Sequence, residues 1–376
     1  MRVPLPAANI IDFIKTPFFL ILSQDKFLWY FIHMKKAVVA LSGGIDSSVS
    51  ALLLKQQGYE VVGLTGKMTE ASDVICQNAK KVADLLQIEH HIFDATLLFQ
   101  EKIINYFEKS YARGETPNPC IMCNKFVKWG VLFDYAIKNL CADIFATGHY
   151  ATIKHDNGIY RLFPAKDETK DQLYFLHKLN QKHLAKTIFP LSDYTKEQVK
   201  QIAIDFNLPS KDSKESQDIC FIEKPFTTKK YLIDKLGLKK GDFVEIGTGK
   251  KIGEHDGCYF FTIGQRKGIG ISAPYPLYVI DINADKNIVY LGKSDDNYKT
   301  RLALKDVNFV YDITNNVFDA MVKIRYNMTA KKAKCKIIDD FIEIEFYEPV
   351  NSITPGQAGV IYNLYDGHLI AGGTVI

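Results

Sequence analysis

The sequence predicts an α/β domain with a doubly wound parallel sheet, followed by a small central domain and a C-terminal β-barrel. Three observations predict this fold class. Strand-like and helix-like segments alternate from Lys36 to about Asn207, and a glycine-rich turn follows the first strand. From about Leu208 onward, helical periodicity gives way to short alternating segments. In doubly wound sheets, ligands bind outside the carboxyl ends of the strands.

The first domain is predicted to alternate strands with helices. Residues 37–41 are a short apolar run before a glycine-rich turn, which is typical of a buried parallel strand. The amphipathic segment that follows ends at Gly58, and glycine commonly terminates helices. The same reasoning predicts strands at residues 37–41, 60–64, 90–93 and 144–146, and helices at residues 46–57, 72–86, 96–111 and 125–140.

The C-terminal part of the chain is richer in glycine and contains short segments with strand-like alternation. They lie at residues 278–281, 288–291, 321–326, 333–338, 342–346 and 359–362. The last hundred residues or so therefore predict a small barrel or sandwich. We place the domains at residues 34–207 (catalytic), 208–282 (small central) and 283–376 (β-barrel).

Residues 1–33 form an apolar and aromatic extension of uncertain status. Charged residues such as Asp12 and Asp25 interrupt it before any run reaches the ~18 apolar residues that a membrane span needs. No small-residue cleavage site follows a clean apolar core, which disfavours a signal peptide. We therefore expect a cytoplasmic protein that does not associate with a membrane, with Met34 as a natural start of the catalytic domain.

The bulk composition is that of a globular protein with functional thiols. The chain has 376 residues and a net charge of +4, which permits a nucleic-acid partner without requiring one. Its seven cysteines are odd in number and unevenly spaced. This pattern fits a reducing compartment and excludes a disulfide scaffold.

Residues 38–48 combine a strand, a Gly-Gly turn and the start of a helix. Gly43 and Gly44 let backbone N–H groups approach an anion closely, and the hydroxyls of Ser42 and Ser47 add donors. The helix that follows directs its positive end to the same place. The segment therefore predicts a phosphate-binding loop, although an ordinary strand-to-helix turn is the alternative. It is not a Walker A loop, because no Gly-Lys-Ser/Thr follows.

Two cysteine-bearing segments lie about a hundred residues apart. Cys120 and Cys123 follow a proline-stiffened loop, and Cys220 precedes an apolar pair. Cys123 is predicted near the start of a helix, where the helix dipole would lower the pKa of its thiol. Lys125 and Lys128 add positive charge nearby.

Three interpretations of these thiols remain open. A structural zinc site is disfavoured, because zinc needs four ligands and the chain has no second Cys-x-x-Cys. Cys123 and Cys220 could form a redox or sulfur-transfer pair. Cys120, Cys123 and Cys220 could instead ligate an iron–sulfur cluster with one open iron site.

Taken together, these segments resemble the bacterial tRNA-specific 2-thiouridylases, the MnmA family of the PP-loop (N-type ATP pyrophosphatase) superfamily. The resemblance runs from Lys36 to the last residues and leaves out residues 1–33. Its matching strings keep the family's order, at residues 40–48, 116–125, 146–150, 170–175, 220–222, 264–270 and 354–357.

The resemblance implies ATP-dependent 2-thiolation of the wobble uridine of tRNA. ATP, with Mg²⁺, would adenylylate the C2 oxygen, with Asp46 and the metal offsetting phosphate charge. A persulfide on Cys220, loaded by a sulfur-donor or carrier protein, would then deliver sulfur as AMP leaves. Cys123 would be the partner nucleophile, either releasing sulfide or closing a transient disulfide with Cys220. We favour this persulfide route over the iron–sulfur route.

The resemblance also implies three groups of binding residues. Chemistry on a base requires its extrusion into a pocket, and phosphate contacts position the RNA. The implied ATP contacts are Ala40, Leu41, Ser42, Gly43, Gly44, Ile45, Asp46, Ser47, Met68 and Gly148. The implied contacts to the target base are Asn118, Pro119 and Cys120. The resemblance also implies that the barrel is a tRNA-binding domain. The implied tRNA contacts are His149, Lys170, Asp171, Gln172, Arg325, Tyr326 and Gln357.

Two departures and two rival functions accompany this resemblance. Cys120 stands where many family members carry an aspartate with a base-like role, so that role is not transferred to it. Gln217-Asp218 replaces small residues, and we expect little consequence. Another PP-loop synthetase would not need Cys123 and Cys220. A catalytically idle RNA-binding protein would not need the intact phosphate loop.

Overall fold

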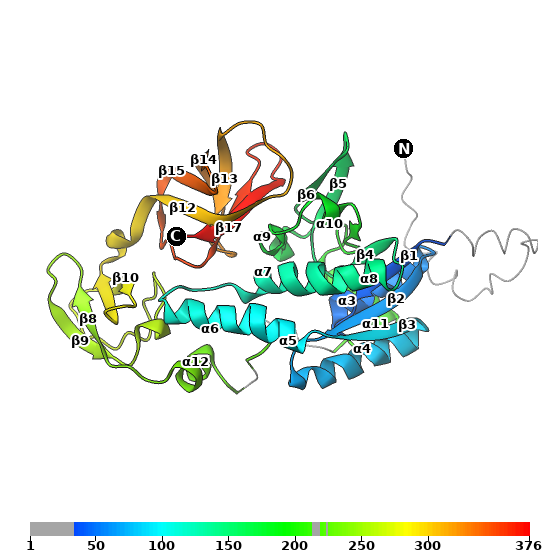
Figure 1. The fold of residues 1–376 in the computed structure, drawn as a ribbon, viewed down its shortest axis with the longest axis horizontal. Coiled ribbons are helices and arrows are strands. Elements are labelled where there is room, and N and C mark those ends of the chain that lie inside the picture. The colour runs from blue at the N-terminus through cyan, green and yellow to red at the C-terminus, as the bar shows by residue number, and fades with distance from the viewer. Residues whose placement is uncertain (1–33, 213–218, 223–224) are drawn as a thin grey trace, which may run out of the picture.

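The computed structural model describes residues 34–212, 219–222 and 225–376. The predictions made for residues 1–33 and for Gln217-Asp218 lie outside the described residues. The molecule is elongated, with the α/β domain at one end and a small mixed sheet at the other (Figure 1). The barrel lies against the middle of the long axis. Among the described residues, no helix is both long enough and apolar enough to cross a membrane.

A five-stranded parallel sheet forms the centre of the first domain, in the order β3-β2-β1-β4-β7. This order confirms the doubly wound prediction. The sequence missed β7, because two residues are too few to show a strand pattern. The strands are β1 (Lys36–Ala40), β2 (Glu60–Lys67), β3 (Glu89–Asp94), β4 (Ile144–Ala146) and β7 (Thr187–Ile188).

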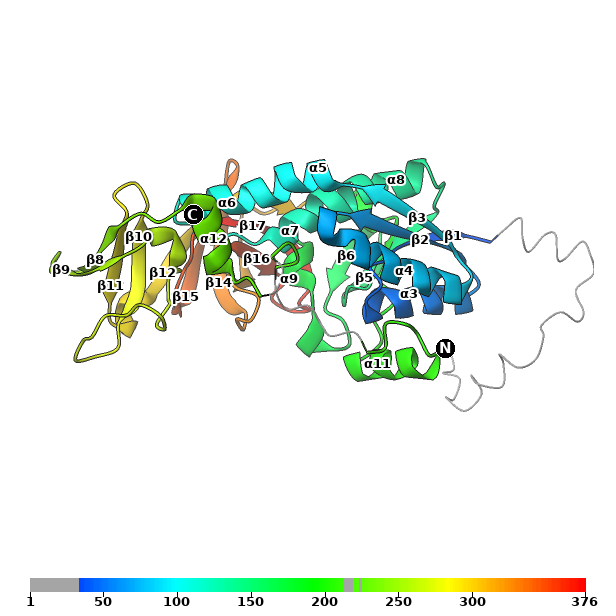
Figure 2. The same cartoon turned by 90° about the horizontal axis from the view of Figure 1, so that it is seen from below.

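Helices cover both faces of this sheet because side chains alternate along each strand. On β1, Ala37 and Val39 enter one core and Val38 enters the other. One face packs under α3 (Ile45–Gln56), α4 (Asp73–Leu86) and α11 (Lys196–Asp205). The other packs under α5 (Thr96–Phe99), α7 (Pro119–Cys123) and α8 (Phe133–Lys138), while α6 (Asn105–Ala112) packs through Phe107 on a separate cluster with Ile222 and Leu232. Figure 2 shows these two helical layers.

The helix predicted from residue 125 begins earlier, at Pro119. Proline is favoured in the first helical turn, and it restricts Asn118 to an extended conformation, here φ −115° and ψ 94°. Between α7 and α8 the helix widens into a π-helical stretch, Asn124–Leu132, that contains a non-helical Gly130. A second π-helical segment, Gln100–Ile104, joins α5 to α6.

Short elements lie between β4 and β7 of the parallel sheet. The hairpin of β5 (Thr152–Asp156) and β6 (Ile159–Phe163) precedes α9 (Leu173–Leu176) and α10 (Gln181–Leu184). In the central region, α12 (Thr228–Leu236) leads into a four-stranded sheet. This four-stranded sheet lies at the end of the molecule opposite the parallel sheet (Figure 1).

The small sheet corrects two predictions. Its order is β10-β11-β8-β9, so the segments at 278–281 and 288–291 belong to it and not to the barrel. The predicted boundary at 282/283 falls inside the β10–β11 hairpin. The strands are β8 (Gly241–Glu245), β9 (Lys251–His255), β10 (Tyr278–Asn283) and β11 (Ile288–Gly292).

A closed barrel completes the chain, as predicted, in the order β12-β15-β14-β13-β16-β17. The sequence missed β12 and β17, and it placed the end of β13 three residues too late, at residue 326. The strands are β12 (Tyr298–Phe309), β13 (Val317–Lys323), β14 (Lys331–Ile338), β15 (Phe341–Asn351), β16 (Ala358–Tyr362) and β17 (Leu369–Val375).

The barrel docks closely on the catalytic domain. Tyr174 Oη donates a hydrogen bond to the carbonyl of Ala358 over 2.9 Å. Asn308 Nδ2 donates to the carbonyl of His177 over 2.7 Å. A Cβ added at Gly372 would lie 2.6 Å from Cγ of the buried His177, so only glycine fits there. These contacts fix the barrel beside the helix that carries Cys120 and Cys123.

Candidate active site

The phosphate loop joins the end of β1 to the start of α3. Ser47 Oγ accepts a hydrogen bond from Ser42 N over 3.2 Å and donates one to the carbonyl of Gly44 over 3.1 Å. Gly43 has a φ of +73°, and a Cβ there would lie 2.7 Å from Asn78 Cβ on α4. Hydrogen bonds of Ser47 therefore stabilise the loop internally, and the absence of a side chain at Gly43 lets the loop pack closely against α4.

The ends of two strands, β1 and β4, meet at this loop. The first-turn amides of α3 have no acceptor within their own helix, and the N-cap residue Gly44 makes no side-chain cap. Gly148 follows β4, and a Cβ there would lie 2.8 Å from Ser47 N. Residues predicted to contact ATP from β1 and from β4 thus lie against each other, and helix amides point out of the loop. This geometry suits a phosphate group.

Asp46, in the first turn of α3, is held by two residues that the sequence did not single out. Lys196 Nζ lies 2.7 and 2.8 Å from its carboxylate oxygens, and Tyr150 Oη donates to it over 3.0 Å. Lys196 is 4% exposed, so a buried cation lies directly beside the phosphate loop. No sequence signal pointed to it, because the fold alone brings α11 next to α3.

The thiols converge near the same edge of the sheet. Cys123 Sγ lies 4.0 Å from Sδ of Met68, a predicted ATP contact at the end of β2. Cys120 and Cys220 are exposed, while Cys123 is buried. After burial and the charge of Lys128, the next influences on the pKa of Cys123 are Cys220 and Cys120. Phe221, next to Cys220, packs against the core that contains Cys123, with its ring centroid 5.9 Å from that of Phe99, so the two cysteine segments meet.

The prediction of a lowered thiol pKa at Cys123 is wrong. The helix begins at Pro119, so Cys123 is its fifth residue and is buried in the core. Burial raises the pKa of Cys123 to about 12, and Lys128 only partly opposes this. Although Cys220 has an exposed surface, the protein around its sulfur raises its pKa to about 11. Both thiols are protonated at neutral pH in this state.

The iron–sulfur interpretation of these thiols stays a prediction. Among the residues described, no group of three histidine, cysteine, aspartate or glutamate side chains is placed to hold a metal ion. All seven cysteines are free thiols. The sulfur-transfer interpretation of Cys123 and Cys220 needs no such group.

Comparisons with known proteins agree along nearly the whole chain. Family profiles described as a tRNA methyl transferase HUP domain, a tRNA methyl transferase PRC-barrel domain and an aminomethyltransferase beta-barrel domain match residues 35–224, 229–293 and 299–376. The tRNA-specific 2-thiouridylase MnmA of Carboxydothermus hydrogenoformans is 40% identical over 363 residues, which are 92% of this chain and 98% of the relative. That of Nostoc punctiforme is 42% identical over 351 residues, 91% and 99% of the two chains.

The chain belongs to the MnmA family. Among solved structures, a 4-thiouridine synthetase–RNA complex with bound ATP aligns with 50% of this chain and 44% of its own, at 20% identity and a TM-score of 0.36. The MnmA relatives extend over all the domains described above, barrel included.

The tRNA contacts expected for an MnmA-family protein gather at the junction of the catalytic domain and the barrel. Tyr326 packs on Phe175 with ring centroids 4.7 Å apart, and Asp171 and Lys170 are close enough to influence the pKa of Tyr326, which burial raises. Burial also raises the pKa of Asp171 to about 6. Gln172 Oε1 accepts a hydrogen bond from Tyr150 N over 3.0 Å. Their contact to tRNA stays a prediction.

His149 and Gln357 are engaged inside the protein. His149 is 8% exposed, and burial holds its pKa well below the usual value, so its ring is neutral. Gln357 Nε2 donates to the carbonyl of Thr116 over 2.9 Å, and Thr116 N donates to the carbonyl of Pro355 over 2.9 Å. The turn at residues 354–357 thereby holds the loop that leads to Asn118 and Cys120.

Arg325 also stabilises the turn at residues 354–357. Its Nη2 atom donates to the carbonyl of Ile263 over 3.1 Å, to that of Ser352 over 2.7 Å and to Thr354 Oγ1 over 3.0 Å. The half-buried guanidinium therefore joins the central region to the barrel. In this MnmA-family protein Arg325 therefore has a structural role, and its contact to RNA phosphate stays a prediction.

Replacing Arg325 with glutamine should lower the free energy of unfolding by about 2–4 kcal/mol, because acceptors of charge-assisted hydrogen bonds lose their donor. Urea denaturation of both variants measures this. The matched control is Arg301→Gln on the same barrel. Arg301 pairs with Glu345 at an exposed site, where less than about 1 kcal/mol is expected. Equal losses in the two variants would contradict the structural role of Arg325.

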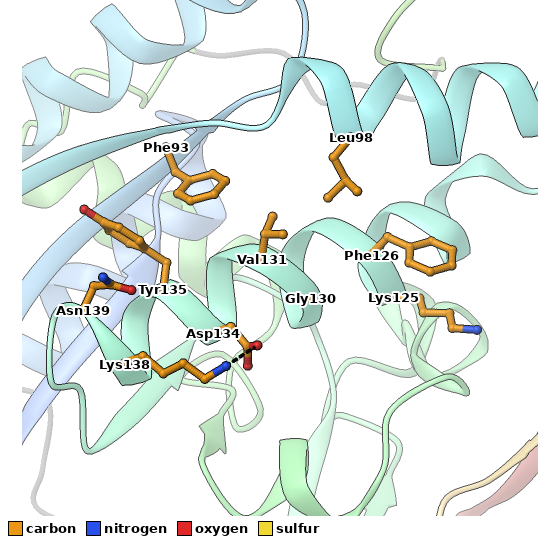
Figure 3. Close-up of a pocket in the computed structure, with 10 residues that line it drawn as sticks. All are labelled: Phe93, Leu98, Lys125, Phe126, Gly130, Val131, Asp134, Tyr135, Lys138 and Asn139. Atoms are coloured by element: carbon orange, nitrogen blue, oxygen red, sulfur yellow. Dashed lines mark hydrogen bonds and ion pairs between the residues drawn. The ribbon is translucent and has the colours of Figure 1, made fainter.

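A cavity of about 430 Å³ opens on the other side of the helix that carries the thiols. Phe93 and Leu98 line it from one side, and Lys125, Val131 and Tyr135 line it from the helix (Figure 3). Lys125 therefore faces away from the thiols, contrary to the expectation that it adds charge beside them.

Proposed function

We propose that this protein replaces the C2 oxygen of the wobble uridine of tRNA with sulfur, at the expense of ATP. The observation that carries the proposal is the convergence of the phosphate loop, Cys123 and Cys220 at one edge of the sheet. The contact between Met68 and Cys123 links the ATP side to the thiol side. The family to which the chain belongs supports the same activity, since its curated members are named tRNA-specific 2-thiouridylases.

In the first step, the uridine C2 oxygen attacks the α-phosphate of ATP and pyrophosphate leaves. Amides of the phosphate loop and the first turn of α3 bind the departing phosphates. Asp46 is the carboxylate available to a Mg²⁺ ion carried in by ATP, because Mg²⁺ is commonly held by one or two carboxylates together with substrate phosphates. Such an ion would offset phosphate charge.

In the second step, sulfur moves from a persulfide on Cys220. The Cys123 thiolate attacks Sγ of Cys220, and a Cys123–Cys220 disulfide forms as the bond to the outer sulfur breaks. That bond's electron pair leaves with the outer sulfur, which becomes the thiocarbonyl of the base as AMP departs with the C–O electron pair. A dithiol reductant restores the two thiols for the next turnover.

The partners follow from this chemistry. The tRNA would lie across the junction where Lys170, Tyr326 and the residue 354–357 turn meet. A protein carrying a persulfide would load Cys220, whose exposed position permits access. Cytoplasmic location remains a prediction.

The decisive experiment supplies purified protein with tRNA, ATP, Mg²⁺ and a persulfide donor, then analyses nucleosides by mass spectrometry. The proposal expects 2-thiouridine at the wobble position, with one AMP and one pyrophosphate formed per sulfur inserted. Formation of ADP and phosphate, sulfur at another atom of the base, or methylation from an added methyl donor without thiolation would each refute it.

A further inference from the structure

Lys128 lies on the thiol side of the helix because of the π-helical stretch Asn124–Leu132. Hydrogen bonds in a π-helix join residue i to residue i+5, so Cys123 and Lys128 are one turn apart on one side. In a regular α-helix, the same spacing would turn them about 140° away from each other. The widening of the helix therefore brings a cation to the sulfur site.

The ammonium group of Lys128 is partly buried and is held by a neutral base. Its Nζ lies 3.3 Å from His149 Nε2, and His149 Nδ1 lies 2.8 Å from Thr147 Oγ1. Burial, and after it the charge of Lys128, hold the pKa of His149 well below its usual value. The neutral ring can therefore accept a hydrogen bond from Lys128 while its Nδ1–H donates to Thr147.

No carboxylate in the described part of the chain forms an ion pair with Lys128. The groups that face it are the three thiols and His149. Burial raises the pKa of Cys120, Cys123 and Cys220, and the charge of Lys128 lowers each of them. Lys128 is the lysine that these three thiols share.

We propose that Lys128 is the cation that stabilises the sulfur anions of the transfer step, and that neutral His149 positions it. This inference rests on the proposed function and adds a residue to it. The anions are the Cys123 thiolate before attack and the outer sulfur that leaves with the electron pair of the broken S–S bond. A fixed ammonium group stabilises both without being consumed.

The test compares Lys128→Met and Lys128→Arg with Lys125→Met, a neighbour on the outward side of the same helix. Iodoacetamide alkylation of each cysteine is followed between pH 7 and pH 10 by peptide mass spectrometry, in the full-length protein without substrates. Cys141 is exposed and serves as an internal reference. Thiolation is then measured at saturating and limiting ATP.

Lys128→Met should slow alkylation of Cys220 about tenfold at pH 8, because the thiolate fraction falls as the thiol pKa rises. Lys128→Arg should stay within about twofold of the wild type, and Lys125→Met and Cys141 should not change. The kcat for thiolation should fall at least tenfold in Lys128→Met, with the KM for ATP unchanged. An unchanged pH profile of Cys220, or an equal shift at Cys141, would overturn the proposal. Absence of thiolation by the wild type would refute the proposed function alone, since the alkylation profiles do not depend on it.

Discussion

Replacing Cys220 with serine should abolish 2-thiouridine formation, with a loss of at least about 10³-fold. A hydroxyl cannot carry the transferable sulfur that a cysteine persulfide supplies, whereas the phosphate loop stays intact. ATP–pyrophosphate exchange in the presence of tRNA should therefore persist. Nucleoside mass spectrometry and exchange of labelled pyrophosphate measure the two halves of the reaction separately.

The control for this substitution is Cys141→Ser, another exposed thiol, which lies outside the thiol cluster. It should keep full activity. Cys123→Ser should lose thiolation while a persulfide still accumulates on Cys220, which intact-protein mass spectrometry would detect as an added sulfur. Thiolation above a tenth of the wild-type rate in Cys220→Ser would remove this cysteine from the mechanism.

Replacing Gly43 with alanine should weaken ATP binding at least about a hundredfold. The added methyl group would lie 2.7 Å from Asn78 Cβ and from Ala79 N, so the loop or α4 must shift. Such a shift misaligns the amides expected to bind phosphate, and the loss of one or two hydrogen bonds to a charged group, at about 1.5–3 kcal/mol each, corresponds to about a hundredfold in affinity. Isothermal titration with ATP, supported by circular dichroism to check folding, tests this expectation.

Gly249→Ala is the matched control because Gly249 also has a positive φ, +68°, but no neighbouring atom within 4 Å of its added Cβ. Both variants carry the left-handed backbone strain of about 1 kcal/mol. A loss of ATP affinity specific to Gly43→Ala would therefore come from close packing of the loop. Equal affinities in the two variants would show that the loop tolerates displacement and would contradict the fitted arrangement.

Local signals in the sequence predicted most of the first domain and its phosphate loop. Buried parallel strands appear as apolar runs, and Gly43 and Gly44 mark the turn between β1 and α3. The helix that carries the thiols begins earlier than predicted, because a proline such as Pro119 can either precede a helix or occupy its first turn. Because Cys123 is the fifth residue of this helix and is buried, its pKa is raised where the sequence predicted a lowered value.

Contacts between distant segments were beyond the reach of sequence patterns. Lys196 lies beside Asp46 only after α11 folds onto α3, and nothing in its local sequence distinguishes it from other helix lysines. Lys125 and Lys128 were equivalent in sequence, yet the π-helical stretch places them on different sides. β17 was missed because its two glycines weaken the strand pattern, although its tight packing on His177 requires one of them.

The residue 354–357 turn makes the catalytic half of the molecule dependent on a domain that supplies no reacting atom. Cut from the barrel, the loop before Asn118 would lose both partners of the Thr116 peptide groups, its amide and its carbonyl. A truncated protein ending before β12 would keep the phosphate loop and the cysteines, but the loop before Asn118 would lose the two hydrogen bonds that the barrel supplies to it. Transferring the proposed activity to another protein therefore requires the barrel as well as the catalytic domain.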